Sequence, residues 1–489
     1  MREWVLSDSG RLLVAAAGSL LPTMWLPVAA GEAALPERQL TCAPHGHMLT
    51  NAAVWSADAR WIVYDTRESL DGSVFDGTRI ERVDVGTGRV EVLYESARGA
   101  CCGVVTASPV DDRVVFIHGP EAPTADWSYS AWHRRGVVVR ADRPGRAETL
   151  DARDLLPPFT PGALRGGSHV HMFSPDGRLV SFTYEDAVLA AAARFAQTKP
   201  PEQNLRGVGV TICDEPVTVP KTHPRNHDGS GFSVLVTRLH DRPTPGSDQI
   251  RWACEEAWVG TDGYCHADGT RQRHALAFQG DVITASGQVI SEVFLVDLPE
   301  GLDELRHPGD GRLAGTATTR PVPPQGVSQR RLTDTTGRRF PGIAGPRHWL
   351  RSSPDGSQIA FLARDEAGVV QIFTVSPTAR PADDGNATLR QITRSPFPIA
   401  SAFSWSPCGR WIAYVADGSV FRAEIESGRC ERLTARQPEA TAPRPEACVH
   451  SPDGCWIAFL RPVPQAEAAA ASRRVFNQIF VVATAAEAD

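Results

Sequence analysis

Histidines are the residues of this sequence whose types and spacing could most readily do chemistry. His169 and His171 alternate along a predicted strand, so period-2 geometry places both on one face, and His348 takes the place of His169 in another copy of the same repeat. Imidazoles converging with Glu446 would hold a divalent transition metal such as manganese, or one imidazole could act as a general base. His169, His171 and His348 are therefore candidate catalytic and metal-binding residues. The alternative, histidines that are hydrogen-bonded and only stabilise the structure, stays open.

A second candidate site is the segment HGPEAPTADWSYSAWHRRG (118–136). Flat apolar faces beside fixed cations suit a sugar or a carboxylate. The candidate ligand-binding residues here are Trp127, His133, Arg134 and Arg135, and His45, His47 and Glu446 join them at the same end of the predicted strands. A long loop that packs on its own aromatic residues is the alternative.

These residues lie around a repeat of an apolar strand, Ser-Pro-Asp-Gly or a relative, and a second apolar strand. Proline and glycine preset the turn and the flanking residues suit buried strands, so each copy predicts the inner hairpin of one blade of a β-propeller. The clear copies are FSPDGRLVSF (173–182), SSPDGSQIAF (352–361), WSPCGRWIAY (405–414) and HSPDGCWIAF (450–459), and the degenerate ones are WSADARWIVY (55–64) and ASPVDDRVVF (107–116).

The spacing of the copies predicts seven blades. The 179 residues between Ser174 and Ser353 are too many for one blade and should hold one more, with insertions. We expect its strands to be GFSVLVTRL (231–239), HALAFQGDVI (274–283), SEVFLVDLP (291–299) and QRRLT (329–333).

A further repeat predicts how the ring closes. QRRLT, LRQIT (389–393) and CERLT (430–434) mark outermost strands, and ERQLT (37–41) precedes the first blade while the last blade lacks its own copy. The sequence therefore predicts an all-β fold, a seven-bladed β-propeller closed by the N-terminal strand. Residues 37–489 would form this single domain, and residues 1–36 a signal-like or non-native extension outside it.

The hairpins resemble the TolB-type, WD40-like propeller repeat. Longer strings, GALRGGSHVHMFSPDG, EEAWVG, HALAFQGD, RRLT and PRHW, resemble the YidR-like family of bacterial propeller proteins from residue 37 to about 460. This resemblance implies a propeller and no particular activity. The segment GGSHVH is also similar to part of the Gln-x-x-His-x-His segment of oligogalacturonate lyases, which implies manganese at His169 and His171. Gly166 stands where those enzymes have glutamine.

Composition excludes several classes of function. The net charge is −7 and no basic run is present, so we expect no nucleic-acid partner. The ten cysteines show no zinc-binding spacing, and no GxSxG elbow, P-loop or dinucleotide motif is found.

Residues 12–30 are apolar, but Glu3 and Asp8 precede them. We favour a cytoplasmic location, and a periplasmic one, with residues 1–30 as signal peptide, stays open.

Three functions fit these observations. The first is a monomeric, ligand-binding propeller with a polar, histidine-lined channel mouth for a small acidic molecule or a saccharide. The second is a metal-dependent lyase on acidic sugars. The third is a protein-interaction platform similar to TolB, which accounts poorly for the histidines.

Overall fold

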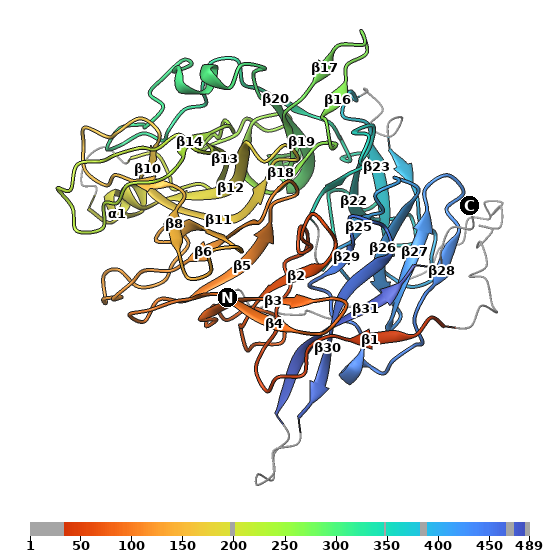
Figure 1. Cartoon of the computed structure of the whole chain (residues 1–489). Coiled ribbons are helices and arrows are strands. Elements are labelled where there is room, and N and C mark those ends of the chain that lie inside the picture. Colours follow the sequence, from red (N-terminus) through yellow and green to blue (C-terminus); the bar gives the residue numbers. More distant parts are fainter. Residues whose placement is uncertain (1–33, 196–200, 347–348, 382–388, 466–473, 485–489) are drawn as a thin grey trace, which may run out of the picture.

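Seven small antiparallel sheets form a ring in the computed structural model, which describes residues 34–195, 201–346, 349–381, 389–465 and 474–484. The chain passes round the ring in order, one blade after another (Figure 1). Blades 1 to 4 consist of β2 (Trp61–Asp65), β3 (Arg79–Asp84) and β4 (Val90–Glu95); β5 (Cys102–Ala107), β6 (Arg113–His118), β7 (Arg135–Arg140) and β8 (Ala147–Thr149); β11 (Gly166–Phe173), β12 (Leu179–Asp186), β13 (Gly207–Ile212) and β14 (Phe232–Leu235); and β15 (Ile250–Trp258), β18 (Ala275–Ile283), β19 (Val289–Asp297) and β20 (Ser328–Arg331).

Blades 5 to 7 follow the same plan. They consist of β21 (Arg351–Ser352), β22 (Ile359–Arg364), β23 (Val370–Val375) and β24 (Arg390–Gln391); β25 (Ser404–Trp405), β26 (Trp411–Ala416), β27 (Ser419–Glu424) and β28 (Cys430–Arg432); and β29 (Cys448–His450), β30 (Trp456–Pro464), β31 (Val475–Ala483) and β1 (Glu37–Gln39). Short pairs outside the blades are β9 (Ala152–Arg153) with β10 (Ala163–Leu164), and β16 (Tyr264–Cys265) with β17 (Arg271–Gln272).

The Ser-Pro-Asp-Gly turns explain why the repeat forms inner hairpins. In blade 3, the Ser174 hydroxyl donates to the Asp176 carboxylate at 2.5 Å and accepts the backbone N–H of Leu179 at 2.9 Å. Gly177 has φ +70°, which glycine adopts at little cost. Ser353 makes the same two contacts in blade 5, with Asp355 and Gln358. One turn chemistry thus sets the hairpin in several blades.

The N-terminal strand closes the ring, as the sequence predicted. β1 pairs antiparallel with β31, with Glu37 opposite Val482 and Gln39 opposite Phe480. In Figure 1 the red strand β1 lies beside the blue strand β31. Just before β1, the backbone N–H of Leu35 donates to the carbonyl oxygen of Leu433, directly after β28 of blade 6, at 2.8 Å. Residues 1–33, most of the predicted extension, lie outside the described residues.

The strand assignment within blade 4 needs correction. The segment 231–239 contains β14, which pairs with β13 and is the outermost strand of blade 3. The inner strand of blade 4 is β15, which ends at Trp258 and is not followed by a Ser-Pro turn. The connection from β15 to β18 contains the hairpin β16–β17. Because the usual marker is missing, the repeat alone could not locate this strand.

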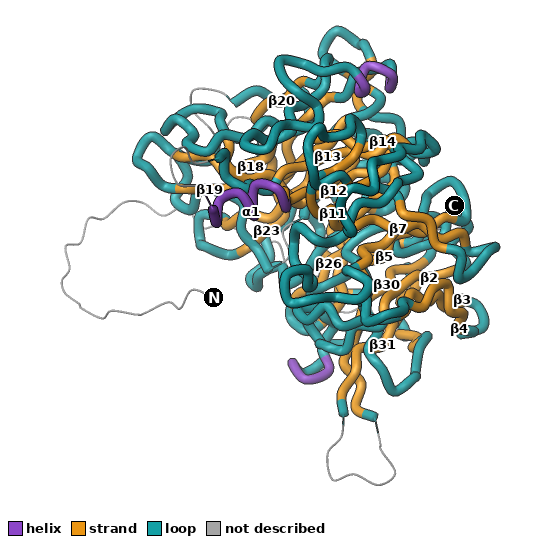
Figure 2. Tube along the Cα trace, turned by 90° about the vertical axis from the view of Figure 1, so that its left-hand side faces the viewer, coloured by secondary structure: helices purple, strands orange, loops and turns teal. Residues whose placement is uncertain are grey.

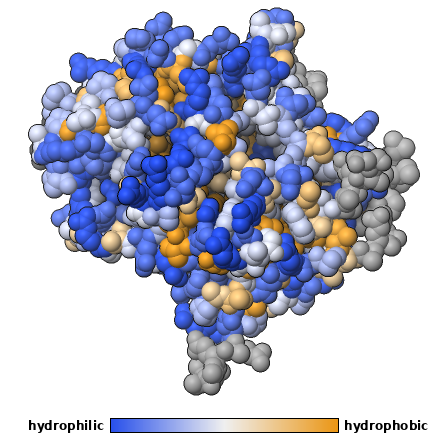
Figure 3. Space-filling view, in the orientation of Figure 1, coloured by the Kyte–Doolittle hydropathy of each residue, from blue (hydrophilic) through white to orange (hydrophobic). Residues whose placement is uncertain are grey.

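Apolar side chains lie between the blades, and few are exposed. Successive core clusters join strands of neighbouring blades, such as β12 and β13 of blade 3 with β15 and β18 of blade 4. Hydrophilic residues cover most of the face in Figure 3, with small separate apolar areas. The helix α1 (Ala187–Phe195) lies on the outside of the ring (Figure 2). Among the described residues, no helix is long and apolar enough to cross a membrane.

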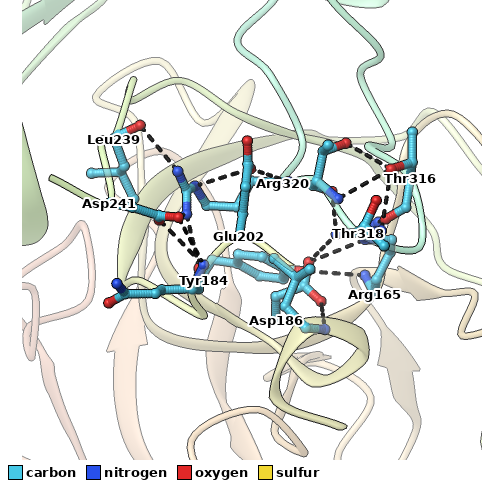
Figure 4. A network of polar contacts seen from close by, with 12 residues as sticks. Arg165, Tyr184, Asp186, Glu202, Leu239, Asp241, Thr316, Thr318 and Arg320 are labelled. Carbon is cyan, nitrogen blue, oxygen red and sulfur yellow. Dashed lines mark hydrogen bonds and ion pairs between the residues drawn. The ribbon is translucent and has the colours of Figure 1, made fainter. Parts of the chain in front are cut away.

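A polar network fixes the insertion between β19 and β20 against blade 3 (Figure 4). This insertion contains the 3-10 helix η1 (Leu302–Arg306). The fully buried Arg165 binds Asp186 at 2.5 Å and donates to the carbonyl oxygens of Thr316 and Thr319. Arg320 donates to Asp241 at 2.5 Å. These charge-assisted bonds order the insertion on the outer part of blade 3.

Candidate functional site

Two consecutive glycines, Gly166 and Gly167, begin the inner strand of blade 3. The segment 118–136, called here the aromatic loop, packs directly on this strand. A Cβ on Gly167 would lie 2.3 Å from a carbonyl oxygen of the aromatic loop and 2.9 Å from the backbone nitrogen of Arg134. A Cβ on Gly166 would lie 2.0 Å from the carbonyl oxygen of Glu185. Neither position can accept a larger residue without a backbone shift. Gly167 therefore lets the aromatic loop pack on β11, and Gly166 lets the end of β12 approach the same strand.

β11 bends between its two histidines, which corrects the expectation that they share one face. Val170 has φ +54°, and the pairing with β12 shifts by one residue after His169. His169 is opposite Thr183, whereas the ring of His171 packs against Phe182 with centroids 6.4 Å apart. Consecutive residues of a strand face opposite sides, so the two imidazoles point to opposite faces of the blade.

The same bulge occurs in the inner strands of blades 2 and 4. Val104 in β5 has φ +57° and Glu255 in β15 has φ +58°, and the pairing shifts there in the same way. This correspondence aligns the three strands residue by residue. Cys254 takes the place of His169 in blade 4, and Glu256 takes the place of His171.

His171 is buried between blades 2 and 3 in a short polar chain. Its Nε2 lies 3.0 Å from the Ser168 hydroxyl, which donates to Asp151 at 3.1 Å. Asp151 also accepts the backbone N–H of Gly136 at 2.6 Å. Burial lowers the pKa of His171 to about 3, so its ring is neutral. The Nδ1 atom of His171 and Oδ2 of Asp151 are buried without a hydrogen-bond partner.

His169 lies on the other face among cationic and aromatic side chains. Removal from water and then the charges of Arg134 and Arg206 hold its pKa well below the usual value, so the ring is neutral. Arg206 binds Glu185 through two nitrogens at 2.5 and 2.9 Å, and its guanidinium lies 4.8 Å from the ring of Trp252. Arg134 forms no ion pair with a carboxylate in the part of the chain that the structure describes. This cation next to a neutral imidazole can bind an anionic group.

The aromatic loop is ordered by stacking. Trp127 stacks on His133 with ring centroids 3.7 Å apart, and the guanidiniums of Arg153 and Arg225 lie 5.7 and 5.8 Å from its ring. The buried Arg153 donates to the carbonyl oxygens of His133, Arg134 and Gly166. The loop therefore packs on its own aromatic residues and is also fixed to β11.

Arg135 differs from its neighbour Arg134 because it forms an ion pair with a carboxylate. It binds Glu121 at 2.9 Å within the same loop. Burial lowers its pKa. Of the two neighbouring arginines, Arg134 is thus the one with no carboxylate bound among the described residues.

A buried cation joins opposite sides of the ring. Arg351 at the start of β21 donates to the backbone oxygen of Asn51 at 3.0 Å and to its side-chain oxygen at 2.5 Å. Glu256 lies on the inner strand of the adjacent blade 4, fully buried, with both carboxylate oxygens lacking a hydrogen-bond partner. Burial raises its pKa to about 8, with a contribution from Glu255.

The other predicted residues lie elsewhere. His45 and His47 stack with centroids 4.4 Å apart beside blade 7, where the Nδ1 atom of the buried His47 bonds to the carbonyl oxygen of Asn477 at 3.0 Å. Glu446 is buried and pairs with Arg444 at 3.3 Å. His348 lies outside the described residues. Its convergence with His169 and His171 stays a prediction.

Sequence reasoning missed Glu256, Arg351, Arg206 and Trp252 as candidate site residues. Glu256 and Trp252 lie on β15, the strand that has no Ser-Pro marker. The string EEAWVG could have located it, because two adjacent carboxylates in a buried strand require a partner or a ligand. Arg351 directly precedes the Ser-Ser-Pro turn of blade 5, where the other blades have mostly apolar residues or threonine.

The described residues do not fit a manganese site made from His169 and His171. The bulge turns the two rings apart, and the Nε2 atom of His171 is bonded to Ser168. Gly166 has no room for the glutamine of the lyase segment. Within the described residues, no group of three or more histidine, cysteine or acidic side chains could hold a metal ion.

Comparison with known proteins decides the family. The chain is 45% identical over 407 residues to the "Uncharacterized protein YidR" of Escherichia coli (strain K12), which covers 82% of this chain and 91% of that protein. The chain belongs to the YidR family. Residues 101–227 also match the family model described as "Protein of unknown function (DUF3748)". That segment contains the aromatic loop, Arg134 and both histidines of β11, so the family's own model includes this part of the candidate site.

Solved structures support the propeller fold of this family member. An oligogalacturonate lyase in complex with manganese superimposes with a TM-score of 0.50 at 11% identity, covering 92% of this chain and 93% of that one. The oligogalacturonate lyase of Vibrio parahaemolyticus gives 0.50 at 9% identity, with the same coverage. At these identities the likeness establishes the shared fold alone.

Proposed function

We propose that this protein binds a small acidic molecule or an acidic saccharide at the mouth formed by blades 2 to 4. The observation that carries the proposal is Arg134, a half-buried guanidinium beside the neutral His169 with no carboxylate bound to it among the described residues. An arginine fork recognises a carboxylate through two parallel hydrogen bonds. The carboxylate of the ligand would bind Arg134 in the way that Glu185 binds Arg206.

The surroundings of Arg134 suit a sugar acid. The ring of Tyr129 lies beside its guanidinium, with 5.9 Å between the ring centre and Cζ. Trp252 of blade 4 provides a second aromatic face, next to the guanidinium of Arg206. Aromatic faces bind the apolar side of a sugar ring while charged groups bind its carboxylate. The neutral His169 would hydrogen-bond a hydroxyl of the same ligand.

Thermal unfolding with matched sugars tests the proposal. Galacturonate and oligogalacturonates should raise the unfolding temperature in proportion to the logarithm of concentration, whereas galactose and neutral galacto-oligosaccharides should not. Equal shifts with the acidic and neutral members of each pair would overturn the role of Arg134.

A lyase activity on acidic sugars is the second candidate. It is favoured by Glu256, a buried carboxyl group whose pKa of about 8 keeps it mostly protonated near neutral pH, so that it would act as a proton donor. Incubation with oligogalacturonate, with and without added Mn²⁺, should then yield an unsaturated product detectable by ultraviolet absorbance. Binding without any such product would leave the protein a binding propeller.

A further inference from the structure

The opposite mouth of the channel, at the Ser-Pro turns, holds an open pocket of about 390 Å³. All seven blades contribute to its lining, so it lies on the axis of the ring. Six blades present the residue just before the serine of the turn, and blade 4 presents the last residue of β15; these residues are Trp55, Ala107, Phe173, Trp258, Ser352, Trp405 and His450. Four of these seven residues are large aromatics. Pockets of this size accept small organic ligands.

The tryptophans of the pocket are held in place by their own hydrogen bonds. The indole N–H groups of Trp55, Trp258 and Trp405 each donate, at 3.0 Å, to a backbone carbonyl oxygen of the preceding blade. Their only polar atoms are therefore already bonded, and what remains for a ligand is flat apolar surface. Such preorganised faces bind a planar apolar group without first having to be ordered.

One cation lies at the inner end of this apolar pocket. Arg351 lines it and is 8% exposed, and its two terminal guanidinium nitrogens donate to oxygens of Leu350 and Asn51. Its Nε atom is buried without a hydrogen-bond partner. Two carboxyl groups, those of Glu255 and Glu256, act on its charge, and burial keeps Glu256 mostly protonated near pH 7. An anionic group entering from the pocket would meet this guanidinium.

We propose that the pocket at the Ser-Pro turns is a second binding site, for a planar aromatic carboxylate. The rings of Trp55, Trp258 and Trp405 would enclose the aromatic part, and Arg351 would bind the carboxylate. This site lies at the other end of the channel from Arg134, so it does not depend on the acidic-sugar site. The two mouths would then bind different acids, one hydrophilic and one apolar.

Tryptophan fluorescence tests this site with a matched pair of probes. Energy transfer from the pocket tryptophans to 2-naphthoate should give saturable quenching, and 2-naphthalenemethanol, which lacks the charge, should bind at least tenfold more weakly. Ala107→Trp should abolish binding of both probes, because it adds to the lining the ring that three other blades already carry there. Val289→Trp, at an exposed position of β19, is the matched control and should bind like the unaltered protein.

A second variant separates charge from shape. Arg351→Met keeps an apolar chain of similar length and should remove the preference for naphthoate over the alcohol. If this variant does not fold, as judged by circular dichroism, Ala107→Trp and the two probes still decide the matter. The proposal is overturned if naphthoate does not bind, if both probes bind equally to the unaltered protein, or if Ala107→Trp binds normally. Arg134→Met should leave naphthoate binding unchanged, which keeps this test independent of the other mouth.

Discussion

Arg351 of blade 5 and Asn51 of blade 1 are joined across the ring by two hydrogen bonds from one guanidinium nitrogen, at 2.5 Å to the side-chain oxygen and 3.0 Å to the backbone oxygen. Blades 1 and 5 are not neighbours, so this contact spans the centre of the propeller. It holds the buried guanidinium of Arg351 inside the ring.

Replacing Asn51 by alanine should therefore destabilise the protein without changing its fold. Loss of the side-chain acceptor for a buried charge should lower the free energy of unfolding by about 1.5–3 kcal/mol. Urea denaturation followed by tryptophan fluorescence measures this, and Gln203→Ala on the exposed surface is the control. A loss no larger than that of the control would show that Asn51 is not the significant partner of Arg351.

Ser168→Ala should cost stability because Ser168 connects two buried groups. Without its hydroxyl, His171 and Asp151 would each lose a hydrogen-bond partner, at a cost of about 1–3 kcal/mol. Gly136→Ala should be worse, since its Cβ would lie 2.7 Å from the Nε2 atom of His171. Thermal unfolding of both variants checks the order. A neutral Gly136→Ala would contradict the close packing of blades 2 and 3.

Acidification should weaken the fold through buried neutral histidines such as His118. Burial lowers the pKa of His118 to about 4, against 6.5 when exposed, so the stabilising effect of the neutral ring is complete above pH 6.5 and is lost as the pH falls toward 4. This loss amounts to up to about 3 kcal/mol. Buried carboxyl groups with raised pKa values, such as Glu256, act in the opposite direction, so a single-residue comparison is needed.

The comparison is between the unaltered protein and His118→Gln at several pH values. The stability advantage of the histidine should shrink between pH 6.5 and pH 4, while His307→Gln, at an exposed position, should show no such trend. A difference that is constant with pH would mean that His118 titrates normally in the folded protein.

Most of the fold could be predicted from the sequence because one local signal repeats. A Ser-Pro-Asp-Gly turn such as 174–177 specifies its own hairpin through contacts within six residues, so the periodicity survives in the sequence. In the same way, the repeat found in QRRLT (329–333) and ERQLT (37–41) allowed the closure of the ring to be predicted. Only the inner strand of blade 4 was misassigned, because β15 ends at Trp258 without that turn, whereas β18, β19 and β20 lie where the sequence predicted them.

The candidate site was harder to predict because its geometry depends on features that alternation does not reveal. The bulge at Val170 places His171 on the opposite face of the strand from His169. The residue types His169-Val170-His171 do not predict the positive φ of Val170. The proximity of Arg134 to His169 depends on the glycines that let two distant segments touch. The chemistry of the aromatic loop was visible in its residue types, whereas the choice between Arg134 and Arg135 required the ion pair of Arg135 with Glu121.

Truncation tests the closure of the ring. Deleting residues 1–33 should leave the unfolding temperature unchanged, whereas deleting residues 1–41 removes β1 and exposes the edge of β31. The longer deletion should cause aggregation, measured by light scattering and size-exclusion chromatography. Equal stability and solubility of both truncated proteins would contradict closure by β1.

The affinity for an acidic sugar with and without the Arg134 guanidinium tests the central claim most directly. Isothermal titration of trigalacturonate should give saturable binding to the unaltered protein and to Arg143→Met, a control arginine on the exposed surface. Arg134→Met should weaken binding at least tenfold, the loss of about 1.4 kcal/mol or more expected for a charge-assisted contact. Unchanged affinity in Arg134→Met, or equal affinity for neutral galactotriose, would contradict the account.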